Sequence, residues 1–75
     1  MFELKDIFEL AIRNNYTNHT FSRTIATFHH NVKQTILTCE QGKDGIYMAF
    51  IDKSGYVFRS EFVNSISNAN LLMEL

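Results

Sequence analysis

The sequence predicts an α+β fold in which an N-terminal helix packs on a three- or four-stranded antiparallel β-meander that is followed by a short C-terminal helix. Three patterns lead to this prediction: an amphipathic pattern over residues 3–15, a hairpin pattern over residues 45–63 and a weaker helical pattern from residue 66 onward. A chain of 75 residues leaves room for a single domain, residues 1–75. Its seven Phe and three Tyr favour a packed core over disorder.

Residues 3–15 are expected to form an amphipathic helix. Its apolar stripe consists of Leu4, Ile7, Phe8, Ala11 and Ile12. Charged residues occupy the opposite side, which is typical of a helix that covers one face of a sheet. Asn14 and Asn15 are expected to end the helix, because Asn tolerates the left-handed backbone conformation found after many helices.

Residues 17–31 support two interpretations. Phe21, Ile25, Phe28 and Val32 have helical spacing, whereas the Thr, Ile and Phe content favours a strand. We expect a strand, which would add a fourth strand to those formed by residues 33–40 and by the hairpin. In the other interpretation the order of helix, helix and hairpin would resemble a winged helix-turn-helix.

The hairpin over residues 45–63 has Asp52-Lys53-Ser54-Gly55 as its predicted loop, with Asp52 at the first turn position and Gly55 in the left-handed position. The loop predicts the cross-strand pairs Phe50–Phe58, Met48–Ser60 and Ile46–Phe62 on one face. On the other face it predicts Tyr47–Glu61, Ala49–Arg59 and Ile51–Val57. A shorter loop would place Phe50 opposite Arg59, and the first register is preferred because it makes a more apolar core face.

The C-terminal helix is predicted to begin after Ser65 or Ser67, either of which can cap it. It is expected to bury Leu71, Leu72 or Leu75 against the rest of the protein. Between the predicted strands, residues 42–45 form a turn with two glycines; a phosphate-binding loop would need a longer glycine-rich stretch before Lys and Ser or Thr.

The residues with chemical potential are His19, His29, His30 and Cys39. Their spacing does not match the paired ligands of zinc sites, and adjacent His residues on a strand point to opposite faces. Cys39 has no oxyanion loop beside it in the sequence, so it is expected to be a small buried apolar residue. We therefore expect one His to be solvated and the other to pack at the end of an element, with no catalytic residues, no cofactor, no metal and no enzymatic activity.

The charge and hydropathy limit the classes of partner. A formal net charge of −1 provides little attraction for nucleic acid. The single Cys excludes an internal disulfide, and no apolar run approaches the roughly 20 residues that span a bilayer. Acidic residues at positions 3 and 6 are unlike the basic start of a signal peptide. We expect a cytoplasmic protein with no membrane association.

By elimination, the sequence favours a small non-catalytic protein–protein interaction module. The partner would be another protein whose identity the sequence leaves open, or a second copy of the chain in a homodimer. The expected binding surface consists of Tyr47, Ile51, Tyr56, Val57 and Arg59. The composition also suggests a phage or mobile-element product that inhibits a host or defence protein. The alternative is a small nucleic-acid-binding regulator with the winged-helix-like arrangement.

Overall fold

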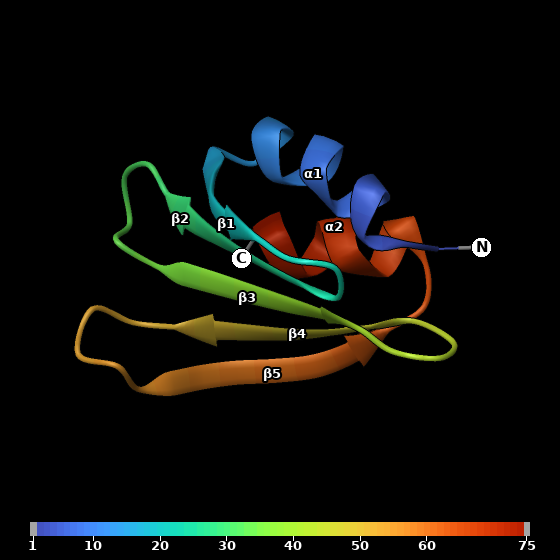
Figure 1. Cartoon of the computed structure of the whole chain (residues 1–75). Coiled ribbons are helices and arrows are strands. Elements are labelled where there is room, and N and C mark those ends of the chain that lie inside the picture. Colours follow the sequence, from blue (N-terminus) through green and yellow to red (C-terminus); the bar gives the residue numbers. More distant parts are fainter. Residues whose placement is uncertain (1, 75) are drawn as a thin grey trace.

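The computed structural model describes residues 2–74, which form one antiparallel sheet with two helices on the same side (Figure 1). The elements are α1 (Leu4–Arg13), β1 (Tyr16–Phe21), β2 (Ile25–His30), β3 (Ile36–Gln41), β4 (Ile46–Ile51), β5 (Val57–Val63) and α2 (Ile66–Glu74). The strand order is β1-β2-β3-β4-β5, a simple meander. The predicted α+β class and the order of helix, meander and helix are confirmed, with five strands in place of three or four.

The additional strand arises because residues 17–31 contain two strands and a tight turn. Ser22 donates its N–H to the carbonyl of Ile25 at 2.8 Å, which closes the connection between β1 and β2. The strand prediction for this segment is confirmed, and the winged-helix arrangement is wrong because its second helix is a β-hairpin. Residues 22–24 contain no Gly, Pro, Asn or Asp, so the sequence pattern carries no strong signal for this turn.

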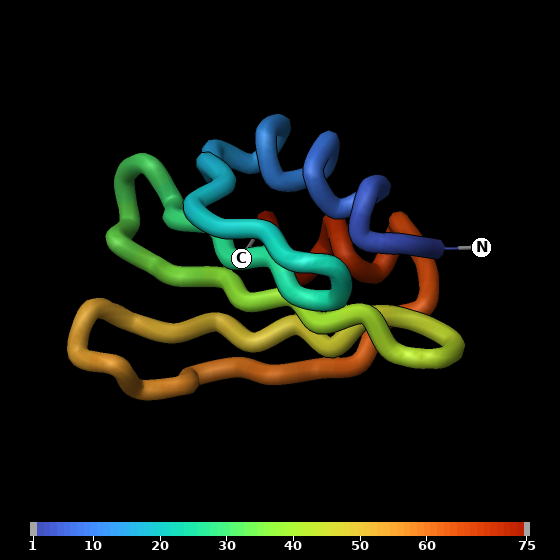
Figure 2. Tube along the Cα trace, viewed as in Figure 1, coloured from blue at the N-terminus to red at the C-terminus, as the bar shows by residue number. Residues whose placement is uncertain are grey.

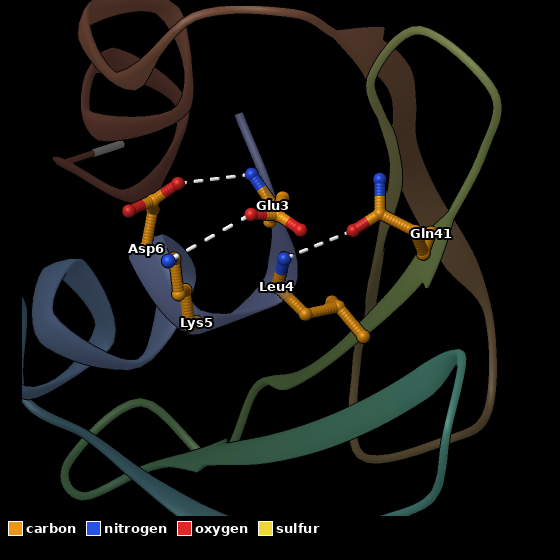
Figure 3. Close-up of polar contacts among 5 residues, drawn as sticks. All are labelled: Glu3, Leu4, Lys5, Asp6 and Gln41. Carbon is orange, nitrogen blue, oxygen red and sulfur yellow. Dashed lines mark hydrogen bonds and ion pairs between the residues drawn. The ribbon is translucent and has the colours of Figure 1, made fainter. Parts of the chain in front are cut away.

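The start of α1 is tied to the end of β3 (Figure 3). Glu3 donates its N–H to the carboxylate of Asp6 at 2.9 Å, and Leu4 donates its N–H to Oε1 of Gln41 at 3.0 Å. Nε2 of Gln41 in turn donates to the carbonyls of Gly42 and Gly45 at 3.1 and 3.2 Å. One side chain therefore holds both the first turn of the helix and the β3–β4 connection.

The end of α1 is fixed by two adjacent Asn residues. Nδ2 of Asn14 donates to the carbonyl of Leu10 at 2.8 Å and to Oδ1 of Asn70 on α2 at 3.0 Å. Asn15 has φ of 68°, the left-handed conformation predicted for it. At the start of α2, Oγ of Ser65 accepts the N–H of Asn68 at 3.2 Å, so the predicted Ser cap is also confirmed.

The core lies between the helices and the facing side of the sheet. Its largest fully buried side chains are Phe28, Ile7, Leu37, Ile46, Met48 and Cys39. Two positions in the helices differ from the predicted stripes: Ile12 is 73 % exposed and Leu71 is 60 % exposed. Leu72 of α2 is buried as expected, and Leu75 lies outside the described residues.

The loop of the β4–β5 hairpin has the predicted conformation. Gly55 has φ of 93° and donates its N–H to the carbonyl of Asp52 at 3.0 Å. The carboxylate of Asp52 accepts the hydroxyl of Ser54 at 2.6 Å and the N–H of Tyr56 at 3.0 Å. These hydrogen bonds, that from the Ser54 hydroxyl first, hold the pKa of the Asp52 carboxyl below its usual value.

The predicted register of this hairpin is wrong beyond the first pair. Ile51 lies opposite Val57 as predicted, but a β-bulge follows and adds one residue to β5. The remaining pairs are Phe50–Arg59, Ala49–Ser60, Met48–Glu61, Tyr47–Phe62 and Ile46–Val63. A shift of one residue moves every following side chain to the opposite face. Figure 2 shows that β5 is the edge strand of the sheet. The bulge is tolerated there because β5 is exposed at every position except Val63, so its helix-side positions need not be apolar.

Candidate protein-interaction surface

The sheet face opposite the two helices has no element packed on it within the described residues, and we call it the open face (Figure 1). Three rows of side chains cross it. The aromatic row contains Ile25, Glu40, Tyr47 and Phe62. The small row contains Thr27, Thr38, Ala49 and Ser60. The aliphatic row contains His29, Ile36, Ile51 and Val57.

The small row forms the floor of a shallow trough between the two rows of larger side chains. Part of this trough, with a volume of about 380 Å³, has Thr38, Ala49 and Ser60 on its floor. The other residues that line it are Tyr47 and Phe62, the acidic residues Glu40 and Glu61, and Met48. The trough runs across the strands because each row is made of one residue from each successive strand.

The two aromatic rings beside the trough are partly exposed and contact each other. The ring centroids of Tyr47 and Phe62 are 4.6 Å apart, and the residues are 57 % and 44 % exposed. Two glycines leave room for them: a Cβ at Gly42 would lie 2.9 Å from the Tyr47 ring, and a Cβ at Gly45 would lie 2.8 Å from the Phe62 ring. The β3–β4 turn therefore positions this aromatic pair.

The open face carries little charge. Glu40 is the one Asp, Glu, Lys or Arg side chain in the three rows. The seven basic residues of the chain lie on α1, in the connections between strands, or on the helix side of β5: Lys5, Arg13, Arg23, Lys33, Lys43, Lys53 and Arg59. Depletion of charge together with exposed aromatic rings is the composition found at the centre of protein interfaces. A nucleic-acid surface would need cations among the aromatic side chains.

The structure brings together three of the five residues expected to bind a partner. Tyr47, Ile51 and Val57 share the open face. Tyr56 lies in the adjoining hairpin loop and is 67 % exposed. Arg59 lies opposite the buried Phe50, and therefore on the helix side of the sheet, where it forms an ion pair of 3.0 Å with Glu61.

Sequence reasoning missed the partners of Tyr47 in the aromatic row. Phe62 was assigned to the core face because the predicted register lacked the bulge, and Ile25 belonged to a segment whose strand boundaries were not resolved. The signal that could have found Phe62 is the sequence of β5 itself: Arg59 and Glu61 alternate with Phe62, so whichever face takes the charges leaves Phe62 on the other.

The three His residues are divided between the two faces. His19 and His29 stack on the open face with ring centroids 4.4 Å apart. Nδ1 of His30 accepts the N–H groups of Val32 and Lys33 at 3.1 and 3.0 Å, so His30 caps the turn after β2. Burial, and then the charge of Lys33, lower the pKa of His30, which favours the neutral ring that can accept these bonds. The solvated His and the His packed at a strand end match the predicted roles.

Cys39 lies in the core with no exposed surface, and burial raises the pKa of its thiol to about 12. Because the thiolate is the reactive form, we expect alkylation of the native protein at neutral pH to be roughly a thousandfold slower than alkylation of the urea-denatured chain. Mass spectrometry of timed iodoacetamide reactions measures both rates. Comparable rates in the two states would mean that Cys39 is accessible, and would return it to consideration as a nucleophile.

A second hollow lies on the helix side, near the end of α2. It has a volume of about 250 Å³ and is lined by Tyr16, Phe50, Phe58, Arg59 and Leu72 among others. This is below the range of roughly 300–1,000 Å³ that is usual for small-molecule sites. The open face is the more extensive candidate for binding.

Comparison of the chain with protein-family models, with curated proteins and with solved structures found no significant match. Among residues 2–74, no three His, Cys, Asp or Glu side chains are grouped as they would be around a metal ion. Neither helix of the described chain has the length and apolar character needed to cross a bilayer.

Proposed function

We propose that this protein is a non-catalytic binding module that recognises another protein through its open face. The observation that carries the proposal is the composition of that face: exposed Tyr47 and Phe62, aliphatic side chains across the trough and a single charged residue in the three rows. A five-stranded sheet covered by helices on one side presents a rigid platform, so little conformational entropy is lost when a partner binds.

The trough indicates the shape of the surface that it would accept. Its floor of Thr38, Ala49 and Ser60 lies lower than the flanking rows, so it fits a ridge of apolar side chains that crosses the strands. Thr and Ser hydroxyls on the floor offer hydrogen bonds to polar groups of that ridge. The partner in this proposal is a folded protein that presents an apolar ridge with few charges.

The action that follows from such a surface is occlusion or tethering of the partner. The narrower role is inhibition of a host or defence protein by a phage or mobile-element product, and its support is the composition of the chain alone. Inhibition would be measured as loss of the partner's own activity on addition of a stoichiometric amount of this protein.

Tyr47→Asp is expected to abolish capture of the partner from a lysate of the native host. A charge introduced into the aromatic row must be desolvated on binding, which typically weakens an interface by 2 kcal/mol or more, roughly thirtyfold in affinity. Quantitative mass spectrometry of the captured proteins measures the loss. Ile12→Asp is the matched control, because it introduces the same charge at an exposed hydrophobic residue that lies on α1 and not on the open face.

Two results would contradict the proposal. One is retention of the same captured protein by Tyr47→Asp while circular dichroism shows that the variant is folded. The other is a salt-sensitive shift of DNA or RNA by the wild-type protein at low micromolar concentration, which would favour the nucleic-acid alternative. Nuclease treatment of the lysate before capture separates the two classes.

A further inference from the structure

The two edges of the sheet differ in how readily they could accept another strand. The bulge in β1 falls between Asn18 and Thr20, and Nδ2 of Asn18 donates to the carbonyls of Thr20 and Thr27 at 3.0 and 3.1 Å. The edge at β1 is therefore irregular. β5 pairs regularly from Arg59 to Val63 and contains neither Lys nor Pro, the residues that commonly protect an edge.

The backbone groups that face outward along β5 follow from the alternation of an antiparallel ladder. Gly42 donates its N–H to the carbonyl of Gly45 at 2.8 Å, so the odd-numbered residues of β4 turn their backbone groups toward β3. The even-numbered residues of β4 turn theirs toward β5, where they meet the odd-numbered residues beyond the bulge. Ser60 and Phe62 consequently turn their N–H and C=O groups toward the free edge.

The sequence of β5 is chemically symmetric about its central residue. It reads Val-Phe-Arg-Ser-Glu-Phe-Val, with Ser60 at the centre, opposite charges on either side of it, and Phe and then Val further out. We propose that β5 pairs in antiparallel orientation with β5 of a second copy about a two-fold axis at Ser60. This pairing joins two five-stranded sheets edge to edge.

Charge complementarity selects this register. With the axis at Ser60, Arg59 lies opposite Glu61 of the partner subunit, and the symmetric contact repeats it. These two residues already share the helix side of β5, where they form an exposed ion pair at 3.0 Å, so the pairing extends an existing charge pair across the interface. Opposite charges at directly opposed positions stabilise a sheet.

The neighbouring registers bring like charges together. Residues whose backbone N–H and C=O groups face the free edge can form hydrogen-bonded pairs only with residues of the same kind in the second copy. The two registers next to the proposed one therefore place the two-fold axis at Arg59 or at Glu61. The first opposes two arginines and the second opposes two glutamates across the axis, and like charges directly opposite are destabilising.

The dimer goes beyond the proposed function and does not depend on it, because it uses the edge of the sheet and leaves the open face uncovered. Two open faces would then lie side by side on one continuous sheet, which would present two binding surfaces to a repeating or dimeric partner. Multivalent engagement of this kind raises the overall affinity without any new contact in either site.

Charge reversal tests the dimer. Arg59→Glu alone and Glu61→Arg alone each place like charges opposite one another twice, so we expect the dimer dissociation constant to rise roughly tenfold or more in either variant. Sedimentation equilibrium over a wide range of protein concentration measures this constant. Circular dichroism serves as the folding control, since the two side chains are 41 % and 49 % exposed.

Two further measurements use the symmetry of the pairing. A mixture of Arg59→Glu protein with Glu61→Arg protein is expected to form a heterodimer, because each chain then opposes the other with the complementary charge. The double variant Arg59→Glu/Glu61→Arg is expected to regain the homodimer. A wild-type protein that stays monomeric overturns the proposal, as does a dimer that survives both single reversals.

A dimer that Tyr47→Asp disrupts and charge reversal leaves intact would place the self-interface on the open face and also overturn this inference. Capture of another protein by a strictly monomeric wild type would support the proposed function while refuting the dimer. The two proposals therefore fail in distinguishable ways.

Discussion

Phe28→Ala is expected to remove about 3–5 kcal/mol of the free energy of unfolding. Phe28 is 1 % exposed, lies opposite Leu37 on the helix side of the sheet, and has its ring centroid 5.3 Å from that of Phe8. Small domains have total stabilities of only about 5–15 kcal/mol, and a chain of this length is expected near the lower end. Urea denaturation followed by circular dichroism should show that most of the stability is lost.

Phe62→Ala is the matched control on the opposite face of the same sheet. Phe62 is 44 % exposed and its ring contacts that of Tyr47, so we expect a cost of about 1 kcal/mol. Similar losses for the two variants would contradict the assignment of one covered and one open face. A Phe62 cost that grows with protein concentration would instead show that self-association covers the open face.

The parts of the fold that could be predicted from the sequence are those determined by short-range chemistry. The left-handed residues Asn15 and Gly55 and the Ser65 cap were each predicted from one residue and its immediate neighbours, and all three are confirmed. Local backbone preferences are strong enough to act without knowledge of the tertiary structure.

The hairpin register could not be predicted because it depends on where the helix layer ends. A pairing that sets Phe50 opposite Phe58 looks better when both sides of the hairpin are assumed to face a core. In the folded protein β5 is an edge strand, so Arg59 can lie opposite Phe50 with its charge in solvent, and Phe58 is accommodated in the bulge. The sequence alone does not say which strand is the edge.

The same error limited the prediction of the candidate surface. Tyr47, Ile51 and Val57 were placed on one face correctly, because the pair Ile51–Val57 precedes the bulge and the alternation within β4 is unaffected by it. Arg59 and Phe62 follow the bulge and therefore exchanged faces. The trough could not be predicted from the sequence, because its floor combines residues from strands whose mutual register the sequence left open.

Gly45→Ala is expected to cost about 3 kcal/mol, more than any other glycine substitution in the chain. A Cβ at this position would overlap the carbonyl oxygen of Val63 and lie 2.8 Å from Cζ of Phe62. Relief would require the start of β4 to move away from the end of β5, which would strain the bonds that the Gly45 carbonyl accepts from Gly42 and Gln41. Overpacking of a closely packed site typically costs 1–3 kcal/mol, and here backbone hydrogen bonds would be lost as well.

Gly55→Ala isolates the contribution of backbone conformation. Gly55 has φ of 93° but no atom within 4 Å of the position a Cβ would take, so we expect only the cost of placing an L-residue in a left-handed conformation, about 1 kcal/mol. Thermal or urea denaturation of both variants measures the difference.

Because Gly45 also leaves space for the Phe62 ring, Gly45→Ala should disturb the aromatic row and weaken partner capture, whereas Gly55→Ala should leave partner capture intact. Equal stability losses for the two variants would mean that β4 and β5 can move apart at Gly45 without an added cost. That result would contradict the assignment of Gly45 as a residue whose close backbone contact positions the aromatic pair.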